Sequence, residues 1–66
     1  MEVFAGCPPH EERFVVALFF DKKQWAELYV EKDQKFLKLF PHPAGKTWIF
    51  KLEEVKDALR KAEAKL

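Results

Sequence analysis

The sequence lacks several residue types on which common enzyme sites and membrane segments depend. It has no serine, no asparagine, one cysteine (Cys7) and one threonine (Thr47). The missing serine excludes a serine triad, and a single cysteine cannot form a disulfide within the chain. The longest apolar run, from Phe14 to Phe20, has seven residues, whereas a membrane-spanning helix needs about 20. We therefore expect neither a serine hydrolase nor a membrane protein.

The start of the chain does not have the pattern of a secretory signal. Met1 is followed by the acidic Glu2, and no apolar stretch with a small-residue cleavage site comes after it. Together with the single cysteine, this predicts a cytoplasmic protein. Two glycines, no asparagine and 35% charged residues are also typical of thermophilic proteins, with a sampling effect in so short a chain as the alternative.

Aromatic residues are abundant: there are ten among 66 residues, and 48% of the chain is hydrophobic. This composition excludes a disordered chain, which would be poor in aromatic side chains. A domain of this length buries only about 60% of the surface that its unfolded chain exposes. A surplus of large apolar side chains therefore predicts a surface that is covered by a partner.

The pattern along the chain predicts an α+β fold, a four-stranded antiparallel β-meander followed by one C-terminal α-helix (ββββα). Residues 1–12 have no period and contain glycine and prolines, so we expect a flexible N-terminal arm before a single domain over 13–66. The expected strands, separated by polar or proline-containing turns, cover 13–20, 25–31, 35–40 and 47–51. A helix over 52–66 is expected from the helical spacing of Leu52, Val55, Leu59, Ala62 and Leu66.

The predicted turns set a register that divides the sheet into two faces. Centring the hairpins on Lys22–Lys23 and Asp33–Gln34 pairs Ala17 with Leu28 and Leu28 with Leu39. The first face is mainly aliphatic and carries Val15, Ala17, Phe19, Ala26, Leu28, Val30, Leu37, Leu39 and Ile49. The second carries eight of the ten aromatic residues and comprises Phe14, Val16, Leu18, Phe20, Trp25, Glu27, Tyr29, Phe36, Lys38, Phe40, Trp48 and Phe50.

A single helix cannot cover this sheet. Four strands span roughly 19 Å, whereas a helix is about 10–12 Å wide. The small aliphatic stripe of the helix predicts that it packs on the first face and leaves the aromatic face open. We therefore expect a small non-enzymatic interaction module, a homodimer joined through the aromatic face or an edge strand. The predicted binding face consists of Trp25, Glu27, Tyr29, Phe36, Lys38, Phe40, Trp48 and Phe50.

The alternative is a binder of single-stranded nucleic acid, in which bases stack on the sheet aromatics and lysines contact phosphates. Residues 22–51 carry seven lysines and three acidic residues. The candidate phosphate contacts in or near turns are Lys22, Lys23, Lys35 and Lys46. The net charge of +1 and the isoelectric point near 7.9 argue against this alternative, because phosphate-binding domains are usually more basic.

Sites for metals, cofactors and catalysis find little support in the sequence. Cys7 and His10 have half of a zinc-ligand spacing, and His42 is a third weak candidate, whereas zinc sites need three or four protein ligands. No glycine-rich phosphate loop is present, and nothing orients a Cys–His pair for catalysis. We expect no bound metal, no cofactor and no enzymatic activity.

Overall fold

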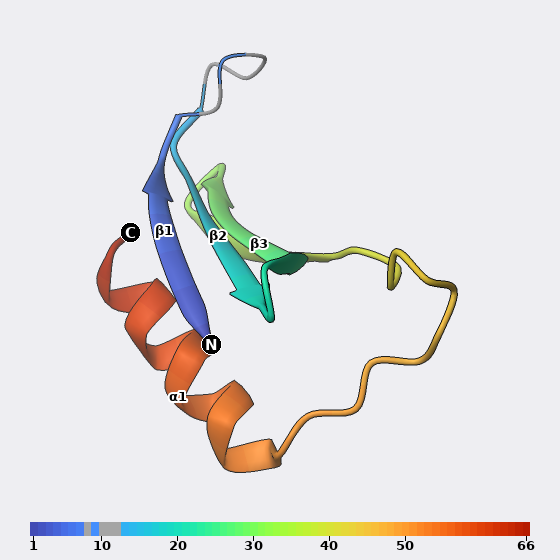
Figure 1. Ribbon diagram of the computed structural model, residues 1–66. Helices are drawn as coiled ribbons and strands as arrows, with labels where there is room; N and C mark the ends of the chain where they lie inside the picture. The colour runs from blue at the N-terminus through green and yellow to red at the C-terminus, as the bar shows by residue number, and fades with distance from the viewer. Residues whose placement is uncertain (8, 10–12) are drawn as a thin grey trace.

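A computed structural model describes residues 1–7, 9 and 13–66 of the chain. Four antiparallel strands form one sheet in the order β1-β2-β3-β4, and one helix follows them (Figure 1). Their bounds are Glu2–Gly6 (β1), Val15–Phe20 (β2), Lys23–Glu31 (β3), Gln34–Leu39 (β4) and Leu52–Ala64 (α1). The predicted α+β fold class, an antiparallel ββββα chain, is confirmed.

One of the four strands is not the one that the sequence predicts. The expected strand over 47–51 is wrong, because these residues belong to no strand. The fourth strand is β1, which lies within the expected N-terminal arm and pairs with β2 at the opposite edge of the sheet. Residues 40–51 join β4 to α1, and we call them the connecting segment. In this segment, Trp48 donates its indole N–H to the carbonyl of Phe40 at 3.0 Å. The Trp48 and Phe50 side chains pack against the core, which holds this segment off the edge of β4.

The β2–β3 and β3–β4 hairpins have tight turns in which two successive residues take positive φ. These are Asp21 and Lys22 at 51° and 64°, and Lys32 and Asp33 at 52° and 64°. Such two-residue turns match the right-handed twist of the strands that they join. The β3–β4 register is therefore shifted by two residues from the predicted one, so that Leu28 pairs with Leu37. A shift of two residues keeps the side chains of these paired residues on their predicted faces, whereas Trp25, which precedes them in β3, lies in the core.

The β2–β3 pair contains an irregularity that reverses the predicted faces of β2. Leu18 pairs with Ala26 and Phe19 with Gln24, so Trp25 is an extra residue in β3. From Val15 to Leu18, on the side of the bulge away from the turn, β2 is displaced by one residue from the predicted register. Val16 and Leu18 consequently share a face with Ala26 and Leu28, contrary to the prediction.

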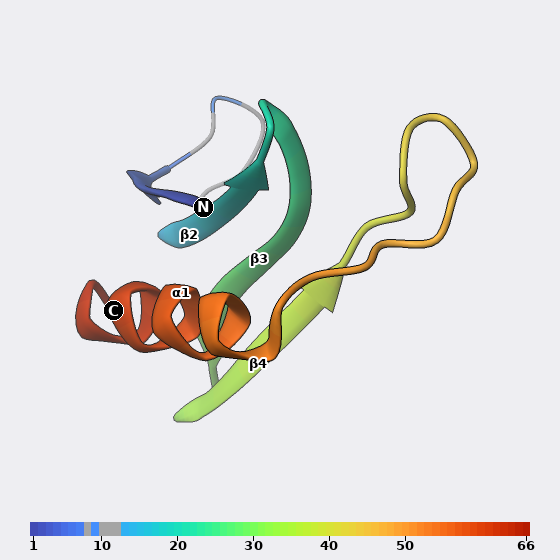
Figure 2. The ribbon, with the colours of Figure 1, turned by 60° about the horizontal axis from the view of Figure 1, so that its bottom comes forward.

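The helix lies on the concave side of the curved sheet and packs mainly against β1 and β2 (Figure 2). We call this side the core face and the opposite side the outer face. The core consists of Val16, Leu18, Trp25, Ala26, Leu28, Ala58 and Ala62. As predicted, α1 packs on the face that carries Ala26 and Leu28. It does so through Val55, Ala58, Leu59 and Ala62, whereas Leu52 and Leu66 of the predicted stripe are exposed. No helix in the described part of the chain has the length and apolar character to cross a membrane.

Candidate functional site

The structure divides the predicted binding face into two groups instead of one. The pairing of β3 with β4 places Glu27 beside Lys38 and Tyr29 beside Phe36 on the outer face. Together with Arg13, these four residues form what we call the outer cluster. The other predicted residues lie elsewhere: Trp25 in the core, Phe40 at the end of β4, and Trp48 and Phe50 in the connecting segment.

Stacked rings and two cations make up the exposed part of the outer cluster. The rings of Tyr29 and Phe36 lie 5.5 Å apart and within 19° of parallel. The guanidinium of Arg13 lies 4.2 Å from the centre of the Tyr29 ring. The Lys38 ammonium lies 5.8 Å from the Tyr29 ring and 6.0 Å from the Phe40 ring. Cations at these distances are attracted to the faces of aromatic rings.

Glu27 lies in the same cluster and is buried although no helix covers the outer face. Only 6% of its surface is exposed. The Lys38 ammonium lies 3.5 Å from Glu27 Oε2, and this oxygen has no hydrogen-bond partner among the described residues. A buried carboxylate needs a compensating charge. We infer that Lys38 supplies this charge and holds the Glu27 side chain against the sheet.

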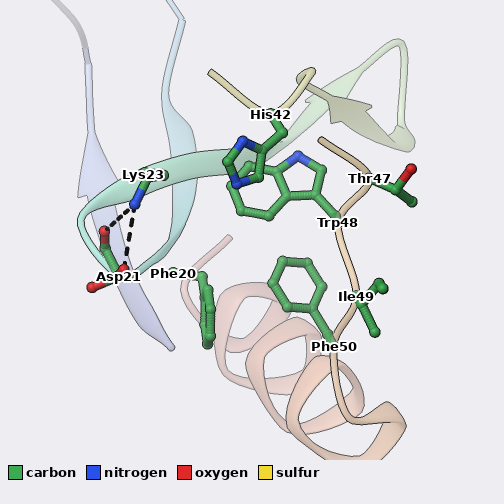
Figure 3. A pocket seen from close by; sticks show the side chains of 8 residues that line it. All are labelled: Phe20, Asp21, Lys23, His42, Thr47, Trp48, Ile49 and Phe50. Atoms are coloured by element: carbon green, nitrogen blue, oxygen red, sulfur yellow. Dashed lines mark hydrogen bonds and ion pairs between the residues drawn. The ribbon is translucent and has the colours of Figure 1, made fainter. Parts of the chain in front are cut away.

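A second group of aromatic residues surrounds a pocket of about 190 Å³ at the end of the sheet, which we call the ring pocket (Figure 3). Its lining residues are Phe20, Asp21, Lys23, His42, Thr47, Trp48, Ile49 and Phe50. The rings of Trp48 and Phe50 lie 5.3 Å apart and within 26° of parallel. Phe20 meets Phe50 edge to face, with ring centres 5.0 Å apart. The rings therefore form a floor and one wall.

His42 closes the ring pocket on the side of the connecting segment. Its ring lies 4.4 Å from the Trp48 ring, at an angle of 48°. His42 Nδ1 accepts the backbone N–H of Ala44 at 3.0 Å. The turn that carries these residues is closed by the N–H of Gly45, which donates to the carbonyl of His42 at 2.9 Å. Gly45 has a φ of 73°, a conformation that a residue without Cβ adopts at little cost.

The lysines predicted to contact phosphate do not form one cationic surface. Lys23 is paired with Asp21 at 3.3 Å, and Lys35 donates a hydrogen bond to Glu63 of α1. This hydrogen bond and the charge of Lys35 hold the pKa of Glu63 below its ordinary value of 4.5. Lys22 and Lys46 are exposed and make no ion pair within the residues that the structure describes. Half of the predicted phosphate contacts are thus already neutralised.

The structure also reveals an apolar surface along β4, of which the predicted binding face includes Phe36 but neither Leu37 nor Leu39. On the core face of this strand, Leu37 is 43% exposed and Leu39 is 67% exposed, because α1 packs over β1 and β2. On the outer face, Phe36 is 39% exposed. β4 is an edge of the sheet. The difference in width between one helix and four strands is the sequence signal for this surface, since a helix of about 10–12 Å leaves part of its own face of a sheet of roughly 19 Å uncovered.

The metal-ligand candidates are not brought together. Cys7 is exposed, His42 lies in the ring pocket, and His10 lies outside the described residues. Among the residues that the structure describes, no three His, Cys, Asp or Glu side chains are grouped as metal ligands are.

The outer cluster and the ring pocket can both bind flat or apolar groups, and each combines aromatic rings with paired charges. The outer cluster belongs to the sheet itself, whereas the ring pocket depends on the connecting segment after β4. Comparison of this chain with known protein families, curated proteins and solved structures finds no match.

Proposed function

We propose that this chain is a small non-enzymatic interaction module that acts as a homodimer, with the β4 strands of two copies joined edge to edge. The observation that carries the proposal is that β4 exposes apolar side chains on both faces at once. Phe36 is exposed on the outer face, and Leu37 and Leu39 on the core face. A partner on one face would leave the other uncovered, whereas another strand beside β4 covers both.

The charges of β4 favour this pairing as well. Lysines on an edge strand normally discourage another strand from approaching. Here Lys35 is paired with Glu63 and Lys38 with Glu27 of the same chain. The edge therefore presents compensated charges beside its apolar side chains. A second copy, which has the same edge, forms an isologous two-fold interface, the commonest arrangement in soluble oligomers.

The ladder between β3 and β4 fixes which backbone groups face outward. The residues that flank the two-residue turn, Glu31 and Gln34, form a hydrogen-bonded pair, and the pairs alternate from there. The outward N–H and C=O groups therefore belong to Lys35, Leu37 and Leu39. A two-fold axis at Leu37 places Leu37 opposite its own copy and Leu39 opposite Lys35 of the other copy, with the four leucines together on the core face.

A disulfide trap tests this arrangement directly. In a chain carrying Cys7→Ala, the substitution Leu37→Cys places two thiols on opposite residues across the axis, where the spacing of paired Cα atoms, about 5.5 Å, permits a disulfide. We expect rapid covalent dimer formation under mild oxidation. The control is Leu52→Cys, at a residue that is 66% exposed but lies away from β4. Equal cross-linking of the two variants, or a monomeric parent chain in sedimentation equilibrium at high concentration, contradicts the proposal.

The second candidate function is binding of single-stranded nucleic acid on the outer cluster. The observation that favours it is the stacked pair of Tyr29 and Phe36 with the cationic groups of Arg13 and Lys38 beside it. Stacking of bases on such rings contributes about 1–3 kcal/mol per base. Since Arg13 is paired with Glu31 and Lys38 with Glu27, few counterions are displaced and the dependence on salt is shallow.

Titration with fluorescently labelled oligonucleotides at several salt concentrations tests this candidate. Phe36→Leu, which removes a ring and keeps an apolar side chain, lowers the affinity if bases stack there. Phe4→Leu, at a residue of β1 that is 56% exposed and belongs neither to the outer cluster nor to the ring pocket, is the matched control. No change of anisotropy at low salt excludes the candidate.

A further inference from the structure

The ring pocket is separate from the proposed dimer edge, since none of its lining residues belongs to β4. We propose that it binds a planar aromatic ring that carries an anionic group. Its size, the arrangement of its rings and the polar groups at its rim all suit such a ligand.

The size of the pocket suits one planar ring system. Its volume of about 190 Å³ exceeds that of the apolar cavity of about 150 Å³ that accepts benzene. Figure 3 shows the broad faces of Trp48 and Phe50 as a floor, with Phe20 standing edge-on beside them. A flat ligand that lies on this floor meets Phe20 at its side, and both contacts are preferred geometries for aromatic rings.

The polar groups at the rim are mainly hydrogen-bond donors. Lys23 contributes an ammonium, whereas the hydroxyl group of Thr47 points away from the rings (Figure 3). His42 Nδ1 accepts the N–H of Ala44, so the neutral imidazole carries its hydrogen on Nε2. That nitrogen has no partner among the described residues. Donors around an aromatic floor suit a ring whose substituents accept hydrogen bonds or carry negative charge.

Asp21 is the acidic residue of the rim, and it does not oppose such a ligand strongly. Its carboxylate lies 3.3 Å from the Lys23 ammonium, and its side chain is 76% exposed. An exposed ion pair of this kind contributes little to stability. A carboxylate or phosphate of the ligand can therefore replace Asp21 as the partner of Lys23, while Asp21 turns to solvent.

Two kinds of molecule combine a planar aromatic ring with an anionic group, namely nucleotides and small aromatic acids. One probe of each kind distinguishes them. The chain contains two tryptophans, so its indole N–H groups give two NMR signals, of which Trp48 reports on the floor. We expect adenosine monophosphate or benzoate, at millimolar concentration, to shift the Trp48 signal in a saturable manner. A response to the first alone identifies a nucleotide, and a response to the second alone a small aromatic acid.

Probes that contain only one part of adenosine monophosphate separate the contribution of the aromatic ring to binding from that of the phosphate. If the nucleotide binds, we expect no shift with ribose 5-phosphate and about fivefold weaker binding of adenosine, the loss of one exposed charge contact. If neither adenosine monophosphate nor benzoate shifts the Trp48 signal, the proposal is overturned. Binding of ribose 5-phosphate as strong as that of the nucleotide also overturns it.

Two variants assign the binding to the pocket. Phe50→Leu removes half of the floor and abolishes the shift, whereas the control Phe4→Leu, at a residue of β1 that is 56% exposed and does not line the pocket, leaves it unchanged. Lys23→Gln weakens the binding of either anionic probe by about fivefold and leaves any binding of adenosine unaltered. If Phe50→Leu fails to fold, as judged from its amide spectrum, Lys23→Gln decides, and an unchanged affinity for the anionic probe overturns the proposal.

Discussion

Replacing Leu39 with lysine is the most decisive perturbation of the proposed dimer. Leu39 is 67% exposed in the single chain, and complete burial of a leucine side chain contributes about 1.5–3 kcal/mol. Covering the exposed part in a dimer therefore contributes about 1–2 kcal/mol per copy, or about 2–4 kcal/mol per dimer. Since 1.4 kcal/mol is a factor of ten, Leu39→Lys raises the dissociation constant by about 30- to 1000-fold.

The identity of the new side chain tests the register. With the axis at Leu37, residue 39 lies opposite Lys35 of the other copy. A lysine at position 39 then adds repulsion between like charges that face each other across the strands, whereas a glutamate adds an attraction. We expect Leu39→Glu to weaken the dimer less than Leu39→Lys does. Equal losses for the two variants would refute the proposed axis while leaving the β4 edge as the interface.

Sedimentation equilibrium over a wide range of protein concentration is the appropriate assay. Leu52→Lys is the matched control, because Leu52 is 66% exposed and begins α1, away from β4. The single chain is affected little by Leu39→Lys, since the part of the side chain that is already buried contributes only about 0.5–1 kcal/mol. A dissociation constant that is unchanged in Leu39→Lys, or changed equally in Leu52→Lys, refutes the reasoning.

Three further predictions concern the folded chain itself. Replacing Lys32–Asp33 with Asn–Gly raises the free energy of unfolding by about 1 kcal/mol, because both residues have positive φ; urea denaturation measures it, and a loss of stability contradicts it. Trp48→Phe keeps an aromatic ring but removes the donor to Phe40, and lowers the free energy of unfolding by about 1 kcal/mol in the same assay; no change shows that the bond contributes nothing. Because Lys35 lowers the pKa of Glu63, the stability from this pair is complete above pH 4.5 and is lost as the pH falls through the lowered pKa. An NMR titration of the Glu63 carboxyl detects the lowered midpoint, and Lys35→Met returns it to its ordinary value.

The elements predicted correctly are those with strong local patterns. β2 and β3 contain β-branched and aromatic residues, β4 contains one phenylalanine and two leucines, and polar turns separate the three strands. α1 has a sustained helical spacing of apolar residues. The faces of β3 and β4 were predictable because their pairing differs from the prediction by two residues. A displacement by an even number leaves the alternation intact.

The features that were not predictable depend on tertiary contacts. The extra residue at Trp25 reverses the faces of β2, and nothing local distinguishes a strand with a bulge from one without. The five residues of β1 carry a weak pattern and become a strand because Val3 pairs with Leu18 and packs on the core. Residues 47–50 have the composition of a strand, yet the bond from Trp48 to Phe40 holds them away from the ladder.

The candidate site was predictable in its parts but not in its arrangement. The alternation of side chains within β3 and β4 correctly predicts that Tyr29, Phe36, Glu27 and Lys38 share one face of the sheet. Trp48 and Phe50 were assigned to the same face only because a strand was expected there. The side chains that remain most exposed on β4 are aliphatic leucines, since α1 packs toward the other edge of the sheet.

The order of the strands has a consequence for how the chain folds. Each strand pairs with the next one in the sequence, so every hairpin closes a short loop and loses little chain entropy in doing so. The docking of α1 on β2 and β1 instead joins segments about 40 and about 54 residues apart, the most costly loop closures among the described elements. We expect the hairpins to form early and the helix to dock last. Substitutions in the turns then change the folding rate, whereas substitutions in the interface of α1 mainly change the unfolding rate.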